Sequence, residues 1–211
     1  MKVGLSKVER LSEQNDFLKS EPPLDSDTSA LPIAKSQTLA DVLSIMADLE
    51  RTGTLWIKGS QSGQDGKIDF IQGKIALAET GSVKQLKAIY RMFFWENSKF
   101  LFHRKQTIES SEPLISIGMG QIIKEGHLQL EKYLKLKKDV PPLNLKLDFV
   151  PQTIQSSTSL TPEEFHALVQ VVEFHYVADI LDYSEHWDIE LYESLIGLRK
   201  SGYIRVASQA A

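Results

Sequence analysis

Two short apolar segments separated by only two residues constrain the fold of this chain more than any other feature. Residues 67–71 (KIDFI) and 74–79 (KIALAE) are typical of strands, and Gln72 and Gly73 stand between them. Glycine adopts positive φ angles at no steric cost, as a two-residue β-hairpin turn requires. We therefore predict an antiparallel hairpin over residues 67–79, with both faces of its second strand covered.

Helices and further strands are predicted on both sides of this hairpin. Thr38 and Asp41 form a capping-box pair before apolar residues at helical spacing, which predicts a helix over residues 39–49. Gly53 suits the left-handed position that ends such a helix. The other predicted elements of this region are a strand at 54–57, a helix opened by Gly81 and a Ser82–Gln85 capping box, a strand at 99–103, a helix at about 113–137 and a strand at 144–150.

Three short helices and a strand are predicted after a Ser/Thr-rich linker at 151–160. Thr161, Pro162 and Glu164 have the spacing of an N-cap, a first helical residue and a capping-box partner. The helices are expected at roughly 162–173, 176–183 and 188–201, followed by a strand at 203–206. Three helices and a strand in this order are typical of a winged-helix unit.

The predicted fold class is therefore α+β, with a small antiparallel sheet packed with helices and then a helical winged-helix-like domain. Residues 1–35 are polar and proline-bearing and are expected to form a flexible N-terminal segment. The predicted domains are an α+β domain at 36–150 and a winged-helix-like domain at 161–206.

The composition limits the chemistry and the location that we expect. The 211 residues contain no cysteine, which excludes disulfides, thiolate nucleophiles and cysteine-based zinc sites. No stretch approaches the ~18 apolar residues of a membrane span, and the chain begins without an apolar signal-peptide core. We therefore expect a cytoplasmic protein with no membrane span.

Neither the glycine-rich loop nor the histidines predict a cofactor or metal site. Ile68 follows Gly66-Lys67 where a phosphate-binding loop needs serine or threonine, and strands rather than a helix are expected around that loop. The five histidines include no pair at the i, i+4 spacing of a helical zinc face. We find no nucleophile elbow either and predict no catalytic residue, no metal and no cofactor.

The order of motifs between residues 36 and 150 resembles the PATAN family of bacterial signalling proteins. After a helix come Thr52-Gly53-Thr54-Leu55, then Gly66-Lys67-Ile68 and the segment 70–76 (FIQGKIA), and finally Trp95 with Phe100. The chain departs from the family at Ser98, where glycine is usual. The resemblance implies a module that binds other proteins, with partners of the type IV pilus motor, small GTPase or histidine kinase class, and with roles in motility and polarity.

Charge distinguishes between two uses of the C-terminal segment. Residues 161–211 carry 3 basic and 9 acidic residues, a net charge of −6. Glu190 and Glu193 lie on the third helix, which would be the recognition helix of a winged-helix protein, and their charges would repel DNA phosphates. Protein docking is therefore expected there, with DNA-binding transcription regulation as the alternative.

Consecutive aromatic residues supply a second candidate protein interface. Phe93, Phe94 and Trp95 cannot all be buried by one helical face, so Phe94 or Trp95 is expected to approach the surface. We therefore expect a non-enzymatic adaptor that binds a protein partner. A small-molecule or cyclic-dinucleotide sensor is the third alternative.

Overall fold

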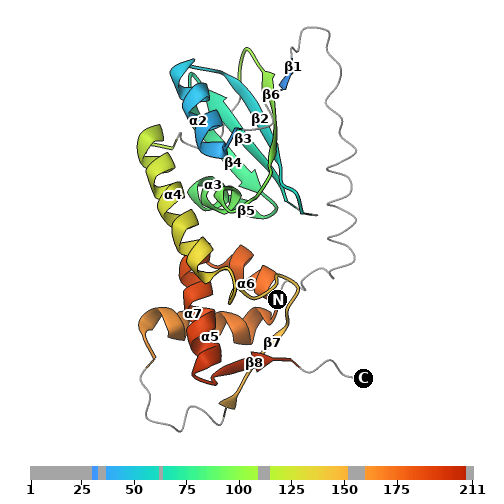
Figure 1. Cartoon of the computed structure of the whole chain (residues 1–211), viewed down its shortest axis with the longest axis vertical. Coiled ribbons are helices and arrows are strands. Elements are labelled where there is room, and N and C mark those ends of the chain that lie inside the picture. The colour runs from blue at the N-terminus through green and yellow to red at the C-terminus, as the bar shows by residue number, and fades with distance from the viewer. Residues whose placement is uncertain (1–29, 33–36, 62–63, 109–114, 152–159, 208–211) are drawn as a thin grey trace, which may run out of the picture.

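A computed structural model of the chain describes residues 30–32, 37–61, 64–108, 115–151 and 160–207 (Figure 1). The fold class is α+β, as predicted. A sheet with its covering helices forms one part, and a helical group with a two-stranded sheet forms the other. The long helix α4 (Met119–Leu136) runs from the first part to the second (Figure 1).

Six antiparallel strands form the larger sheet, in the order β1-β6-β2-β3-β4-β5. The predicted hairpin is confirmed, since β3 pairs with β4 and the connecting residues Gln72 and Gly73 have φ angles of 48° and 75°. The loop after Lys58 joins the paired strands β2 and β3, as expected for a hairpin loop. The strands are β1 (Ala30–Pro32), β2 (Gly53–Lys58), β3 (Asp65–Ile71), β4 (Lys74–Thr80), β5 (Val83–Lys84) and β6 (Lys99–Arg104).

Three helices supply the rest of the first hydrophobic core: α2 (Leu39–Asp48), α3 (Gln85–Phe93) and α4. Thr38 caps α2 in the predicted capping box with Asp41. On β2, Leu55 and Ile57 are buried in this core, whereas Trp56 between them is partly exposed on the other face. We call this part of the chain, from β1 to the first turns of α4, the sheet unit.

The second core belongs to what we call the helical unit: α5 (Pro162–Phe174), α6 (Val177–Tyr183), α7 (Asp188–Lys200), β7 (Leu147–Phe149) and β8 (Ile204–Val206). The capping box of Thr161 and Glu164 is confirmed, with Pro162 in the first turn. No second strand follows β8 within the described residues, which end at Ala207, so the winged-helix assignment stays a prediction.

Several details differ from the sequence-based predictions, among them the start of α4 at Met119 rather than near residue 113. Glu50, with φ of 45°, takes the left-handed position after α2, and Gly53 instead begins β2. Ser82 does not cap α3, because β5 intervenes and Lys84 is the N-cap residue. Within the segment expected to be flexible, Ala30–Pro32 pair with β6; residues 1–29 lie outside the described residues. The strand β7 pairs with β8 and so joins the helical unit, although the sequence grouped it with residues 36–150.

We predict that Gly53→Ala is far more destabilising than Gly81→Ala. A Cβ at Gly53 would lie 2.3 Å from the backbone oxygen of His103, so the strands would have to move apart. A Cβ at Gly81 meets nothing within 4 Å, and only its φ of 56° opposes a side chain. Chemical denaturation should show a loss of at least about 3 kcal/mol for Gly53→Ala and about 1 kcal/mol for Gly81→Ala. Equal losses would contradict this assignment of the two glycines.

Candidate protein-interaction surfaces

A partly buried cluster of charges joins the sheet unit to the helical unit. The guanidinium of Arg91 on α3 donates to both carboxylate oxygens of Asp188, at 2.5 and 2.9 Å, and to a carboxylate oxygen of Asp182. It also donates to the backbone oxygen of Leu181 at 3.1 Å. The two hydrogen bonds to Asp188 make this pairing bidentate, which is the strongest form of an arginine–carboxylate contact. Asp188 is only 5% exposed, so little water reaches its carboxylate.

Lys87, one helical turn before Arg91, extends this cluster. Its ammonium group donates to the backbone oxygens of Leu181 and Ser184, at 2.6 Å each, and lies 3.7 Å from Asp188. Burial lowers the pKa of Lys87, and the charge of Asp188 only partly offsets this. Burial also opposes the charge of Arg91, but hydrogen bonds and charges from Asp188 and Asp182 raise the pKa of Arg91 overall.

Aromatic rings also pack against one another where the two units meet. Phe94 stacks on Tyr133 of α4 with ring centroids 4.6 Å apart, and Tyr133 in turn lies 6.2 Å from Tyr192 of α7. Tyr90 meets Trp187 edge-on at 5.2 Å. The two units are therefore held together by α4, by an aromatic row and by the Arg91 cluster.

Two of the predicted interface residues, Phe94 and Trp95, pack against other residues of the same chain. Phe94 is half-buried against Tyr133, and Trp95 is half-buried against the first core with its ring over Gly66. Each is thus partly accessible, but much of each ring already has a partner within the chain. A role for Phe94 or Trp95 in binding another protein stays a prediction.

The helix α7 is the central helix of the second unit and presents little surface. Eight of its residues are buried, among them Asp188 at its start and Leu198 near its end. Glu193 is exposed, whereas Glu190 is half-buried and accepts a hydrogen bond from the backbone N–H of Trp187 at 3.3 Å. The accessible positions of α7 form one narrow stripe, because Glu190, Glu193, Gly197 and Lys200 follow one another at the i, i+3, i+7, i+10 spacing of a single side of the helix.

Two of the three C-terminal histidines lie together. The rings of His166 and His186 are 4.3 Å apart, and His186 Nδ1 lies 3.5 Å from a carboxylate oxygen of Glu190. Among the described residues, no group of three or more histidine and acidic side chains is arranged to hold a metal ion.

The most exposed apolar surface of the helical unit lies on α5. Phe165, Val169 and Val172 are 61%, 44% and 52% exposed and follow one another at the i, i+4, i+7 spacing of a single helical stripe. Residues so spaced lie on the same side of a helix. The sequence reasoning missed this stripe, because α5 is apolar on more than one side and its pattern alone does not show which side is buried.

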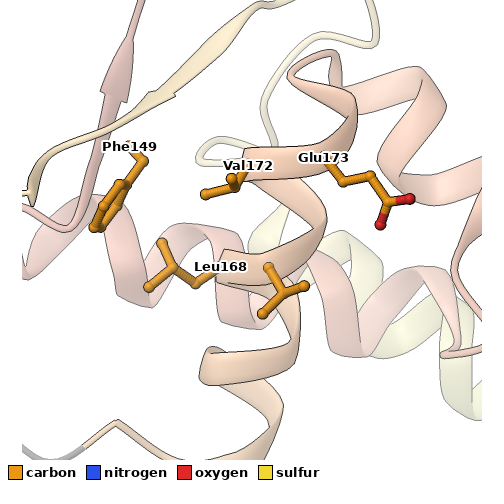
Figure 2. A pocket seen from close by; sticks show the side chains of 5 residues that line it. Phe149, Leu168, Val172 and Glu173 are labelled. Atoms are coloured by element: carbon orange, nitrogen blue, oxygen red, sulfur yellow. The ribbon is translucent and has the colours of Figure 1, made fainter.

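An open apolar groove lies between α5 and β7, beside Val169 and Val172 of this stripe. It has a volume of about 260 Å³ and is lined by Phe149, Leu168, Val169, Val172 and Glu173. Figure 2 shows Phe149 of β7 facing Leu168 and Val172, with Glu173 at the opposite end of the row. Glu173 is the one ionisable residue of this lining. The lining of the groove is therefore apolar apart from this one carboxylate.

Comparison with known proteins found no family model, curated protein or solved structure that matches the chain significantly. The resemblance to the PATAN family thus stays a prediction. No helix of the described residues is long and apolar enough to cross a membrane.

We predict that Arg91 and Asp188 are strongly coupled in stability. Arg91→Met leaves the buried Asp188 carboxylate without its main partner and should cost about 3 kcal/mol, and Asp188→Asn should cost a similar amount. The double variant should lose about 1–3 kcal/mol less than the sum of the two single losses. Urea denaturation of the wild type, the two single variants and the double variant measures the four free energies of unfolding that this double-mutant cycle needs. Losses that add within about 0.5 kcal/mol would contradict the coupling.

Proposed function

We propose that this protein is a non-enzymatic adaptor that binds another protein through the exposed face of α5 and the groove beside it. The observation that supports this most directly is the stripe of Phe165, Val169 and Val172, which exposes apolar surface along a helix. Contiguous apolar surface of this kind commonly marks an interaction site. A phenylalanine at its edge is a suitable anchor residue.

The way in which the units join also favours a role in protein binding. Arg91 and Lys87 fix the start of α7 and the end of α6 against α3. Partner binding at α5 would therefore meet a preorganised surface, which lowers the entropic cost of association. The motif order that resembles the PATAN family supports the same class of function, with a pilus motor component, a small GTPase or a histidine kinase as partner.

DNA binding through α7 has less support. A recognition helix places an exposed face in the major groove, whereas α7 is largely buried and its accessible residues include Glu190 and Glu193. Their charges would face the phosphates. A cyclic-dinucleotide sensor is disfavoured at the α5 groove in the same way, since Glu173 would repel an anionic ligand.

The test is partner capture followed by reconstitution. The full chain is used as bait in native cells, and proteins that it retains are identified, purified and titrated against it by calorimetry. We expect that Val172→Asn weakens binding of the purified partner at least about tenfold, the loss of one anchor contact. The matched control is Leu134→Asn on α4, which removes an equally exposed apolar side chain, 52% against 52%, and should leave binding unchanged.

Two results would overturn the proposed function. One is a partner whose affinity falls equally with Val172→Asn and Leu134→Asn, which would place the contact elsewhere. The other is specific turnover of a small substrate by the purified chain without any protein partner.

A further inference from the structure

We propose that a second copy of this chain occupies the α5 surface when no other partner does, in an antiparallel pair of α5 helices. In this pair, Phe165 of each copy enters the groove of the other. The inference rests on the proposed function, because it uses the same interaction surface. It adds that self-association covers this surface until another protein takes it.

The two halves of this contact lie on the same side of α5, one after the other along the helix. Phe165 has the highest exposed fraction of any large apolar side chain among the described residues, 61%, and it does not line the groove. The groove lies further along α5, where Val172 lines it opposite Phe149 of β7 (Figure 2). Seven residues separate Phe165 from Val172, which is about 10 Å along a helix axis.

An antiparallel partner helix brings the exposed ring of one copy to the groove of the other. A two-fold axis halfway between Phe165 and Val172, next to Val169, places Phe165 of each copy against Val172 of the other. The same contact then forms twice, as in other isologous dimers. A cavity of roughly 150 Å³ accepts benzene in another protein. The groove, at about 260 Å³, therefore has room for a phenyl ring.

Charge does not oppose this pairing. Glu173 is the one ionisable residue of the groove lining. The antiparallel arrangement sets the two copies of Glu173 about 13 Å apart along the helix axis, which exceeds the Debye length of ~8 Å at physiological salt. Glu163 lies on the opposite side of α5 from the stripe, and Glu164 is engaged in the capping box with Thr161.

The small size of the contact makes this dimer weak. A standard interface between proteins uses roughly 20–30 residues on each side, whereas one stripe on one helix and the wall of its groove supply far fewer. We therefore expect a dissociation constant above about 1 μM. A partner with a larger complementary surface would displace the second copy.

Sedimentation velocity of the full chain at concentrations up to about 1 mM tests the dimer. We expect the wild type to dimerise reversibly and Val172→Asn to raise the dissociation constant at least about tenfold, because Val172 receives the incoming phenyl ring. The matched control is Leu134→Asn on α4, where the replaced side chain has the same exposed fraction, and it should leave the dimer unchanged. Circular dichroism confirms that each variant is folded.

Disulfide trapping tests the orientation of the two helices. The chain contains no cysteine, so each single-cysteine variant reports only on its own position. Val169→Cys lies next to the two-fold axis and should form a disulfide between copies under mild oxidation. Val172→Cys should not, because its two copies lie about 10 Å apart along the axis and a disulfide needs Cα atoms within ~7 Å. Leu134→Cys, outside the contact, should form none.

The outcomes separate this inference from the proposed function. A chain that stays monomeric up to about 1 mM, a dimer that Val172→Asn leaves intact, or a Val172→Cys disulfide as efficient as that of Val169→Cys would overturn the inference. A purified partner whose binding depends on Val172 would then leave the proposed function standing. Conversely, the expected dimer beside a partner that binds Val172→Asn at full affinity would keep the inference and overturn the proposed site.

Discussion

The pairing of Arg91 with Asp188 is the contact on which the arrangement of this molecule depends. It joins residues 97 positions apart, one on the helix that covers the sheet and one at the start of the central helix of the second unit. Asp188 is buried and Arg91 is largely buried, so the loss of either partner leaves the other charge poorly compensated. Lys87 and Asp182 complete the cluster, and the row of rings from Phe94 to Tyr192 supports it with apolar contact. Direct polar and aromatic contacts therefore join the two units.

That junction also decides which surfaces of the helical unit remain accessible. With the start of α7 held against α3, and with α5 packed across it, α7 becomes a core helix: Asp188 is buried, and Glu190 and Glu193 lie on its narrow accessible side. The accessible helix is α5, whose outer side carries the stripe of Phe165, Val169 and Val172. Apolar side chains that stay exposed do not stabilise the monomer, whereas their burial would contribute ~25 cal/mol per Å² of apolar surface removed from water. Binding of a partner would recover that burial, which is why we propose the interaction site there.

The negative charge of the C-terminal segment has two separate uses in this structure. Asp182 and Asp188 bind Arg91 of the sheet unit, whereas Glu173 remains at the surface beside the α5 groove. Net charge alone supported the sequence-based preference for protein docking over DNA binding, and it implicated Glu190 and Glu193. The distribution of the charges in space shifts the proposed site from α7 to α5.

The sequence by itself determined the features that depend on residues a few positions apart. The hairpin at Gln72 and Gly73 and the capping boxes of Thr38 and Thr161 follow from local backbone preferences and hydrogen bonds, which tertiary contacts left unchanged. Only the tertiary structure decided the pairing of β7 with β8, the burial of Asp188 by Arg91 and the exposure of one side of α5. The reason is physical: α5 is apolar on more than one side, so its periodicity does not specify which side faces the core. That choice is made by the helices and strands that pack against α5, and these come from distant parts of the chain.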